Sequence, residues 1–316
     1  LSHQALPDSL AKEGLLMLKA LLAEISYFSN VHLTVLLDWR IDSSQFSNNT
    51  NLVIISNQQN IYKLLPEMIK SVDYVWPIAP EFDEILLRIT KLIENQSKKL
   101  LNSSSEAIAI CSNKLVTSQL LNQNAIATVK TTSLEVFYEQ LGSWVIKPKD
   151  GAGSLNSYLV VNVEGFNKVV SQIDTRSDYI IQPYIEGRIM SLSCLFRDGD
   201  AWLLCCNQQI ISIDKGMFQL DSCDVNITIK QPDVYQTLLD QVASAIPGLF
   251  GYVGIDIIHP VNKWPLVLEI NPRLTTSYVG LNQAIGFNTA KAVFEMIEEP
   301  PVIHKIRDKQ VSISIL

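Results

Sequence analysis

Two acidic residues lie inside apolar segments near the C-terminal end of the chain. Asp256 stands between two isoleucines, Glu269 stands between a leucine and an isoleucine, and Asn271 follows two residues later. Residues i and i+2 of a strand point to the same side of a sheet, so Glu269 and Asn271 share a face. Burying an unpaired carboxylate is costly, and both acidic residues have apolar neighbours. We therefore favour an arrangement in which the two strands direct these oxygens to one cation over an arrangement in which both carboxylates face water. The hard oxygen ligands predict a magnesium site made by Asp256, Glu269 and Asn271.

A lysine followed by a glycine loop gives a second chemical signal. Lys147 ends an apolar segment, and the loop after it contains Gly151, Gly153 and Ser154. Glycine lets backbone amides approach phosphate oxygens, and the lysine supplies a positive charge. The Gly-Lys-Ser/Thr pattern of a Walker motif is absent. The segment therefore predicts a lid over phosphates, with a purely structural glycine hairpin as the alternative.

One arginine follows the predicted metal ligands in a turn rich in hydroxyl groups. Arg273 is followed by Leu274, Thr275, Thr276 and Ser277. A guanidinium there could hold a carboxylate or stabilise the charge on a transferring phosphoryl group, whereas the alternative is a surface ion pair. The sequence contains no Cys/His or Ser/His arrangement that indicates a side-chain nucleophile.

Composition excludes several classes of protein. The chain has 316 residues, 47% hydrophobic and 18% charged, which is more than one small core holds and favours a multi-domain globular protein. The net charge of -7 argues against nucleic-acid binding, and the apolar runs are too short to predict a membrane span. The five cysteines form no CxxC pair, which indicates free buried thiols and a cytoplasmic protein.

The first hundred residues alternate between helical and strand patterns, as an open α/β sheet would. We expect the first strand of that sheet to lie upstream of the printed sequence. Residues 95–105 are rich in Asn, Ser and Lys and predict a surface linker. The predicted helices are 15–25, 61–69 and 82–93, and the predicted strands are 32–37, 52–56 and 74–77.

The rest of the chain predicts a small α+β lid followed by antiparallel strands. The lid has a helix at 114–121 and strands at 144–147, 157–161 and 179–182. Strands then follow at 190–195, 201–206, 208–213, 254–258 and 265–270, with helices at 234–245 and 288–296. These patterns predict an N-terminal α/β domain over 1–105, a lid subdomain over 106–185, and a C-terminal metal and substrate subdomain over 186–316.

Taken in order, these motifs resemble the ATP-grasp superfamily. The resemblance is carried by Lys114, Lys147 with its glycine loop, the segment 182–187, Asp256, and the segment 269–273. It covers about residues 107–300, and the preceding unit is similar to a pre-ATP-grasp domain. The resemblance implies an ATP-grasp fold, ATP as the nucleotide, and Mg²⁺, with Mn²⁺ as the alternative metal.

The resemblance also implies roles for individual residues. Lys114, Lys147 and the glycine loop would contact ATP phosphates, and Arg273 would face a reacting acyl phosphate. Ile189 stands where many family members have an acidic ribose contact, so Glu186 is the candidate substitute. The adenine hinge would be formed by Gln182, Pro183, Tyr184 and Ile185.

Shorter segments are similar to the tyramine:glutamate ligases of methanofuran biosynthesis, whose bacterial relatives would use tyrosine for methylofuran. These segments are 13–21, 36–38, 78–81 and 207–209. They imply that the substrates are L-glutamate and either tyrosine or tyramine, whereas the ATP-grasp resemblance implies a ligase that works through an acyl phosphate and releases ADP. We also expect small-molecule partners and a homodimeric assembly. The alternatives are a D-alanine:D-alanine-like or pyrrolysine-pathway-like ligase, and a non-catalytic ATP-binding regulator.

Overall fold

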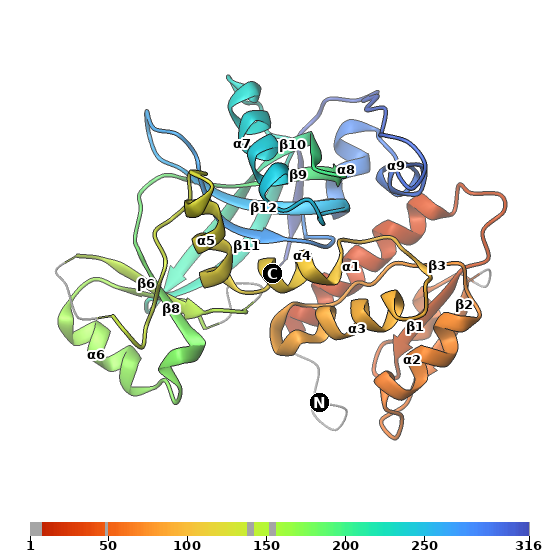
Figure 1. The fold of residues 1–316 in the computed structure, drawn as a ribbon, viewed down its shortest axis with the longest axis horizontal. Coiled ribbons are helices and arrows are strands. Elements are labelled where there is room, and N and C mark those ends of the chain that lie inside the picture. Colours follow the sequence, from red (N-terminus) through yellow and green to blue (C-terminus); the bar gives the residue numbers. More distant parts are fainter. Residues whose placement is uncertain (1–7, 48–49, 138–141, 152–155, 316) are drawn as a thin grey trace.

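The structure is a computed structural model that describes residues 8–47, 50–137, 142–151 and 156–315 (Figure 1). An N-terminal unit lies beside a larger unit built on one extended sheet. Within the described ranges, no helix is long and apolar enough to cross a membrane.

The N-terminal unit alternates helices and short parallel strands, as predicted. β1 (Thr34–Asp38) pairs with β2 (Asn51–Ile55), and β3 (Tyr74–Val75) pairs with β4 (Lys99–Leu100). The described strands thus form two separate parallel pairs rather than one open sheet. The helices of this unit are α1 (Asp8–Ile25), α2 (Ile61–Lys70) and α3 (Ile85–Glu94), with short 3-10 turns at Ser43–Gln45 and Phe82–Glu84.

The predicted surface linker at 95–105 is wrong in its central part. β4 lies within it, and Leu101 and Ser103 are buried. The Ser103 hydroxyl donates to the Phe250 carbonyl at 3.3 Å and accepts from the Phe250 amide at 3.1 Å. These hydrogen bonds allow a polar segment to be buried. Its polar composition therefore wrongly indicates a segment at the surface. The predicted domain divisions at residues 105 and 185 remain predictions.

The main sheet has the strand order β13-β12-β9-β10-β11-β7-β6-β8-β5, and β14 also pairs with β11. Where β7 meets β11, one residue pair, Tyr158 with Met217, is in register. The strands are β5 (Thr132–Ser133), β6 (Trp144–Pro148), β7 (Tyr158–Val160), β8 (Tyr179–Pro183), β9 (Arg188–Arg197), β10 (Asp200–Asp214), β11 (Met217–Val225), β12 (Gly251–His259), β13 (Leu266–Asn271) and β14 (Val311–Ser314).

β10 is one strand where the sequence predicts two strands separated at Asn207. The Asn207 side chain is buried, and its amide donates to the hydroxyls of Ser191 and Ser193. A polar residue can therefore continue a buried strand when the neighbouring strand supplies acceptors. The sequence patterns also miss β11, α6 (Val163–Ser171) and α8 (Tyr278–Ile285).

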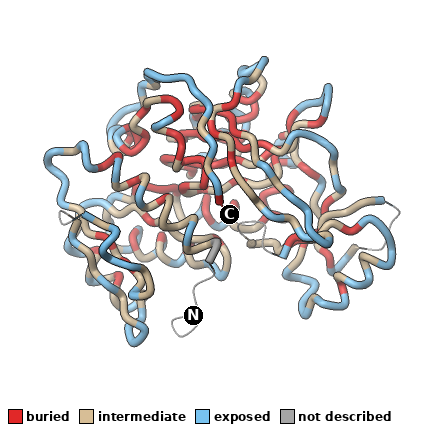
Figure 2. Tube along the Cα trace, turned by 180° about the vertical axis from the view of Figure 1, so that it is seen from behind, coloured by how far each residue is buried: buried red, intermediate tan, exposed pale blue. Residues whose placement is uncertain are grey.

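Helices cover both faces of the wide end of the sheet (Figure 1), and the buried residues gather in this part of the molecule (Figure 2). Successive residues of β9 point to opposite faces, so Cys194 packs in one core and Leu195 in the other. The first core includes residues of α4 (Ser105–Cys111), α5 (Lys114–Gln123) and α7 (Pro232–Ala245), and the second includes residues of α1, α8 and α9 (Thr289–Glu295). α1 therefore fixes the N-terminal unit to the sheet. As predicted, the cysteines are free and buried.

Candidate active site

A cavity of about 290 Å³ lies where the lid strands β6 and β8 face strands β10 to β13. Most of the predicted site residues line it. These are Lys114, Lys147, Gly151, Gln182, Pro183, Tyr184, Ile185, Asp256, Glu269, Asn271 and Arg273. Glu186 is exposed and is not among the lining residues within the described part of the chain. Gly153 and Ser154 lie outside the described residues.

The predicted metal ligands meet on two adjacent strands. β12 and β13 are antiparallel, and their register places Asp256 opposite Glu269. Asn271 donates through Nδ2 to Asp256 Oδ2 at 3.1 Å. Gln209, on β10, donates to the other Asp256 oxygen at 2.9 Å. No sequence pattern indicates this role for Gln209, because β9 lies between β10 and β12 in the sheet.

The two facing carboxylates have opposite pKa shifts. Burial, and then the nearby charge of Glu269, raise the pKa of Asp256 well above its ordinary value. Burial also opposes the charge on Glu269, but the attraction of Lys114 and Lys147 outweighs it and lowers the pKa of Glu269 to about 2. A second negative charge at Asp256 is therefore unfavourable beside the ionised Glu269. A divalent cation between them would remove the repulsion, and the oxygen donors fit magnesium.

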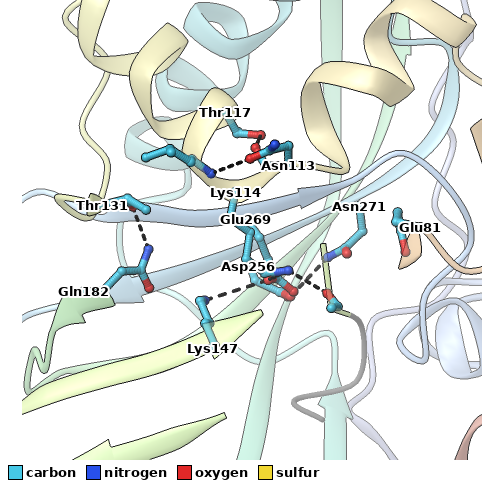
Figure 3. Close-up of polar contacts among 12 residues, drawn as sticks. Glu81, Asn113, Lys114, Thr117, Thr131, Lys147, Gln182, Asp256, Glu269 and Asn271 are labelled. Atoms are coloured by element: carbon cyan, nitrogen blue, oxygen red, sulfur yellow. Dashed lines mark hydrogen bonds and ion pairs between the residues drawn. The ribbon is translucent and has the colours of Figure 1, made fainter. Parts of the chain in front are cut away.

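Two nearly buried lysines face Glu269 (Figure 3). Lys114 Nζ lies 3.3 Å from Glu269 Oε2 and donates to the Gly151 carbonyl at 2.6 Å. Lys147 Nζ lies 3.9 Å from the same Glu269 oxygen. Burial lowers the pKa of Lys147 to about 8, with Lys114 adding to this effect and Glu269 opposing it. The two ammonium groups give the cavity a site for anionic oxygens.

The position of Lys114 is unfavourable for helix stability. It is the first residue of α5, where a positive charge opposes the helix dipole. Asn113 caps this helix by accepting from the amides of Leu115 and Val116. The lysine is therefore better explained by its contacts with Glu269 and Gly151 than by the helix that carries it.

The end of the cavity nearest the lid is mainly apolar. Gln182 is buried there, and its amide donates to the Thr131 hydroxyl at 2.8 Å. Tyr184 is exposed at the cavity wall, and Ile185 follows it. The apolar lining also includes Val129, Val145, Ile211, Phe218 and Leu268. Thr131 was missed from the sequence, because no local pattern links it to Gln182.

Arg273 is part of a buried ion pair, so the surface-pair alternative is wrong. Its side chain is 13% exposed and that of Glu81 is 6% exposed, and their closest atoms are 2.7 Å apart. The guanidinium also donates to the Leu274 carbonyl at 3.0 Å. The segment that contains Glu81 is distinguished in the sequence only by its resemblance to known ligases. It gave no sign of the contact with Arg273.

A second glutamate from the N-terminal unit reaches the same end of the cavity. Glu13, on α1, lines the cavity and accepts from the Thr276 hydroxyl at 2.8 Å. Thr275 and Ser277 also line it, and their hydroxyls are 3.0 Å apart. The cavity is thus apolar at one end, charged at its centre, and rich in hydroxyl groups at the other end.

Two protein-family models match successive parts of the chain. A model of the ATP-grasp domain matches residues 111–277, and a model of the pre ATP-grasp 3 domain matches residues 31–108. The chain therefore belongs to the ATP-grasp family. The predicted fold class and the predicted resemblance are both confirmed.

Two enzymes and one solved structure are similar to most of the chain. The tyramine–L-glutamate ligase of Methanocaldococcus fervens is 28% identical over 309 residues, which are 97% of this chain and 94% of that protein. The enzyme of the same name from Methanocaldococcus jannaschii is 31% identical over 275 residues, 86% of this chain and 79% of that protein. A crystal structure of an ATP-grasp superfamily protein from Archaeoglobus fulgidus has the same fold, with a TM-score of 0.75, 24% identity, and coverage of 98% of this chain and 88% of that one.

Proposed function

We propose that the protein is an ATP-dependent ligase that joins the γ-carboxyl group of L-glutamate to the amine of tyramine. The observation that carries this proposal is the cluster in which Lys114, Lys147 and Asp256 all face Glu269. This cluster lies in a cavity between the lid strands and Arg273. The names of the relatives support glutamate and tyramine as the substrates.

The donor set fits magnesium, which neutralises phosphate charge when it is bound. Asp256, Glu269 and Asn271 would hold the ion through their side-chain oxygens, and Gln209 would keep Asp256 in place. Use of Mn²⁺ instead, assembly as a homodimer, and a cytoplasmic location remain predictions.

The mechanism has two steps and needs no side-chain nucleophile. A glutamate γ-carboxylate oxygen attacks the γ-phosphorus of ATP, the bond to the bridging oxygen breaks, and ADP leaves. The tyramine nitrogen then attacks the acyl carbon, phosphate leaves with the bonding electron pair, and the nitrogen loses a proton. Lys114 and Lys147 bind phosphate oxygens, and Arg273 stabilises the negative charge that develops at the acyl group.

Three alternatives to the proposed function are open. Two of them change the substrates, and the third is a protein without catalytic activity. Tyrosine in place of tyramine remains a prediction from the sequence, whereas the relatives' names support tyramine. A D-alanine:D-alanine-like or pyrrolysine-pathway-like ligase would use the same lysines and metal ligands with other substrates. A non-catalytic regulator is disfavoured, because Arg273 is retained at the far end of the cavity from the lid.

Product analysis tests the proposal. Purified protein is incubated with ATP, magnesium, glutamate and either tyramine or tyrosine, and the products are identified by mass spectrometry. We expect γ-glutamyltyramine, ADP and phosphate in equal amounts. AMP as the nucleotide product would refute the acyl-phosphate mechanism. Turnover that requires a different pair of amino acids would refute the substrates and leave the mechanism standing.

A further inference from the structure

Glu13 is a cavity residue that the proposed mechanism leaves without a role. It comes from α1, outside the part of the chain that matches the ATP-grasp domain model. α1 is held against the main sheet by buried Met17, Leu21 and Ile25. It is also anchored by Glu24, whose carboxylate accepts from the Tyr278 hydroxyl at 2.9 Å and from the Ala290 amide at 2.7 Å. Glu13 is therefore presented to the cavity by a fixed helix.

The contact with Thr276 locates Glu13 along the cavity. β13 runs past the apolar lid end at Leu268, then through the metal ligands, and the chain continues through Arg273 to Thr276. Glu13 accepts from the Thr276 hydroxyl, so it lies beyond the metal ligands as seen from the lid. It therefore faces the end where the acid and the amine react rather than the end that holds the nucleotide base.

Glu13 forms no ion pair with any cation among the described residues. Arg273 is the nearby cation and is attracted by the charge of Glu13, but its guanidinium forms its ion pair with the buried carboxylate of Glu81. Among the described residues, no lysine, arginine or histidine lies within ion-pair distance of Glu13. The Thr276 hydroxyl occupies one oxygen of the Glu13 carboxylate. The arrangement is that of a carboxylate held in place and available to a positively charged ligand.

We propose that Glu13 binds the primary ammonium group of an amino substrate. This inference rests on the proposed function, in which both substrates carry such a group. One source is the α-ammonium group of glutamate, and the other is the amine of tyramine before it loses its proton. In both cases the carboxylate accepts charge-assisted hydrogen bonds from the ammonium group, and Thr276 keeps the carboxylate oriented.

Equilibrium binding separates the two sources. Radiolabelled glutamate and radiolabelled tyramine are each measured against the full chain with ADP and magnesium present. We expect Glu13→Gln, which keeps the acceptor for Thr276, to weaken binding of one probe about tenfold and to change ADP binding less than twofold. Weaker glutamate binding assigns the α-ammonium group, and weaker tyramine binding assigns the attacking amine. Thr276→Val should weaken the same probe to a smaller extent.

The control is Glu67→Gln, which removes an exposed carboxylate on α2 that pairs with Lys70. It should bind both probes as the wild type does. The inference would be overturned if wild type and Glu13→Gln bound each probe equally well. It would also be overturned if the wild type bound neither probe. Probe binding that depends on Glu13 without ligase turnover would instead refute the proposed function and support the ammonium site.

Discussion

Glu81 Oε2 accepts a hydrogen bond from Arg273 Nε at 2.8 Å and lies 2.7 Å from Nη2 of the same guanidinium, with which it forms an ion pair. The pair joins the N-terminal unit to the turn after β13. The other Glu81 oxygen is buried and has no hydrogen-bond partner among the described residues. The ion pair thus fixes the orientation of the guanidinium from outside the ATP-grasp domain, and Glu81 acts as a positioning residue for Arg273.

Glu81→Gln should impair both stability and rate. Removing one partner of a buried ion pair leaves the other charge uncompensated, which costs about 3 kcal/mol of unfolding free energy. We also expect kcat to fall about tenfold while KM for ATP stays within twofold, because the change affects Arg273 and not the lysines. Urea unfolding and steady-state kinetics measure the two effects. In Glu67→Gln, where the lost pair with Lys70 is exposed, both quantities should remain near wild type.

Arg273→Lys should lose most of the ligase rate although it keeps the positive charge. A lysine has one nitrogen, so it cannot reproduce the hydrogen bond from Nε to Glu81, the Nη2 ion pair with Glu81 and the bond from Nη1 to the Leu274 carbonyl together. We expect kcat to fall at least about tenfold when turnover is measured by the release of phosphate. Arg197→Lys is a suitable control, because Arg197 contacts the exposed Asp198 and the Glu298 carbonyl away from the cavity. Near-normal turnover of Arg273→Lys would show that a simple charge is sufficient.

Glu269→Gln should abolish turnover with a much smaller effect on folding. The variant removes a charge that faces Lys114 and Lys147 and that would be a metal ligand in the proposed site. We expect kcat to fall about a hundredfold or more at every magnesium concentration tested. Glu298→Gln, which removes an exposed carboxylate paired with Lys99, is the matched control. Activity restored by high magnesium would mean that Glu269 contributes affinity for the ion and is not needed for turnover.

Glu24 should make stability depend on pH. Burial raises the pKa of Glu24 from 4.5 to about 7, in spite of hydrogen bonds from Ala290 and Tyr278. Between these two values the unfolded chain loses the proton and the folded protein keeps it. The contribution of Glu24 to stability therefore falls as pH rises from 4.5 to 7, by about 3 kcal/mol in total.

Glu24→Gln tests this dependence because glutamine does not titrate. Urea unfolding of both proteins at several pH values between 4.5 and 8 gives the difference in unfolding free energy. We expect wild type to lose stability relative to the variant across this range. Parallel curves for the two proteins would contradict the raised pKa of Glu24.

The sequence predicted those parts of the site that depend on local patterns. Strand periodicity placed Glu269 and Asn271 on one face, and apolar neighbours indicated that Asp256 is buried. Glu13 and Glu81 could not be found in this way, because their contacts with Thr276 and Arg273 join segments far apart in the chain. These contacts exist only because α1 and the segment before α3 pack against the main sheet.

The fold was predicted best where apolar periodicity was strong and least well where polar residues are buried. β10 appeared interrupted at Asn207 because its amide is polar, but acceptors on β9 satisfy it. The segment 95–105 appeared to be surface for a related reason, since Ser103 is buried with both of its bonds directed to Phe250. A single sequence does not reveal these distant partners.

The narrow junction between β7 and β11 has a mechanical consequence for the lid. Tyr158 and Met217 form the registered pair there, and two further backbone bonds join Leu159 to Gly216 and Phe218 to Ser157. Strands β6, β7 and β8 pair with one another beyond this junction. Rotation of the lid about this pivot would strain the bonds at the junction and the bond that the Lys114 amide donates to the Lys149 carbonyl, but it would leave the pairing of β9 with β12 and of β12 with β13 intact. Closure of the lid over nucleotide, which remains a prediction, would therefore turn the narrow end of the sheet while the strands that carry Asp256 and Glu269 stay fixed.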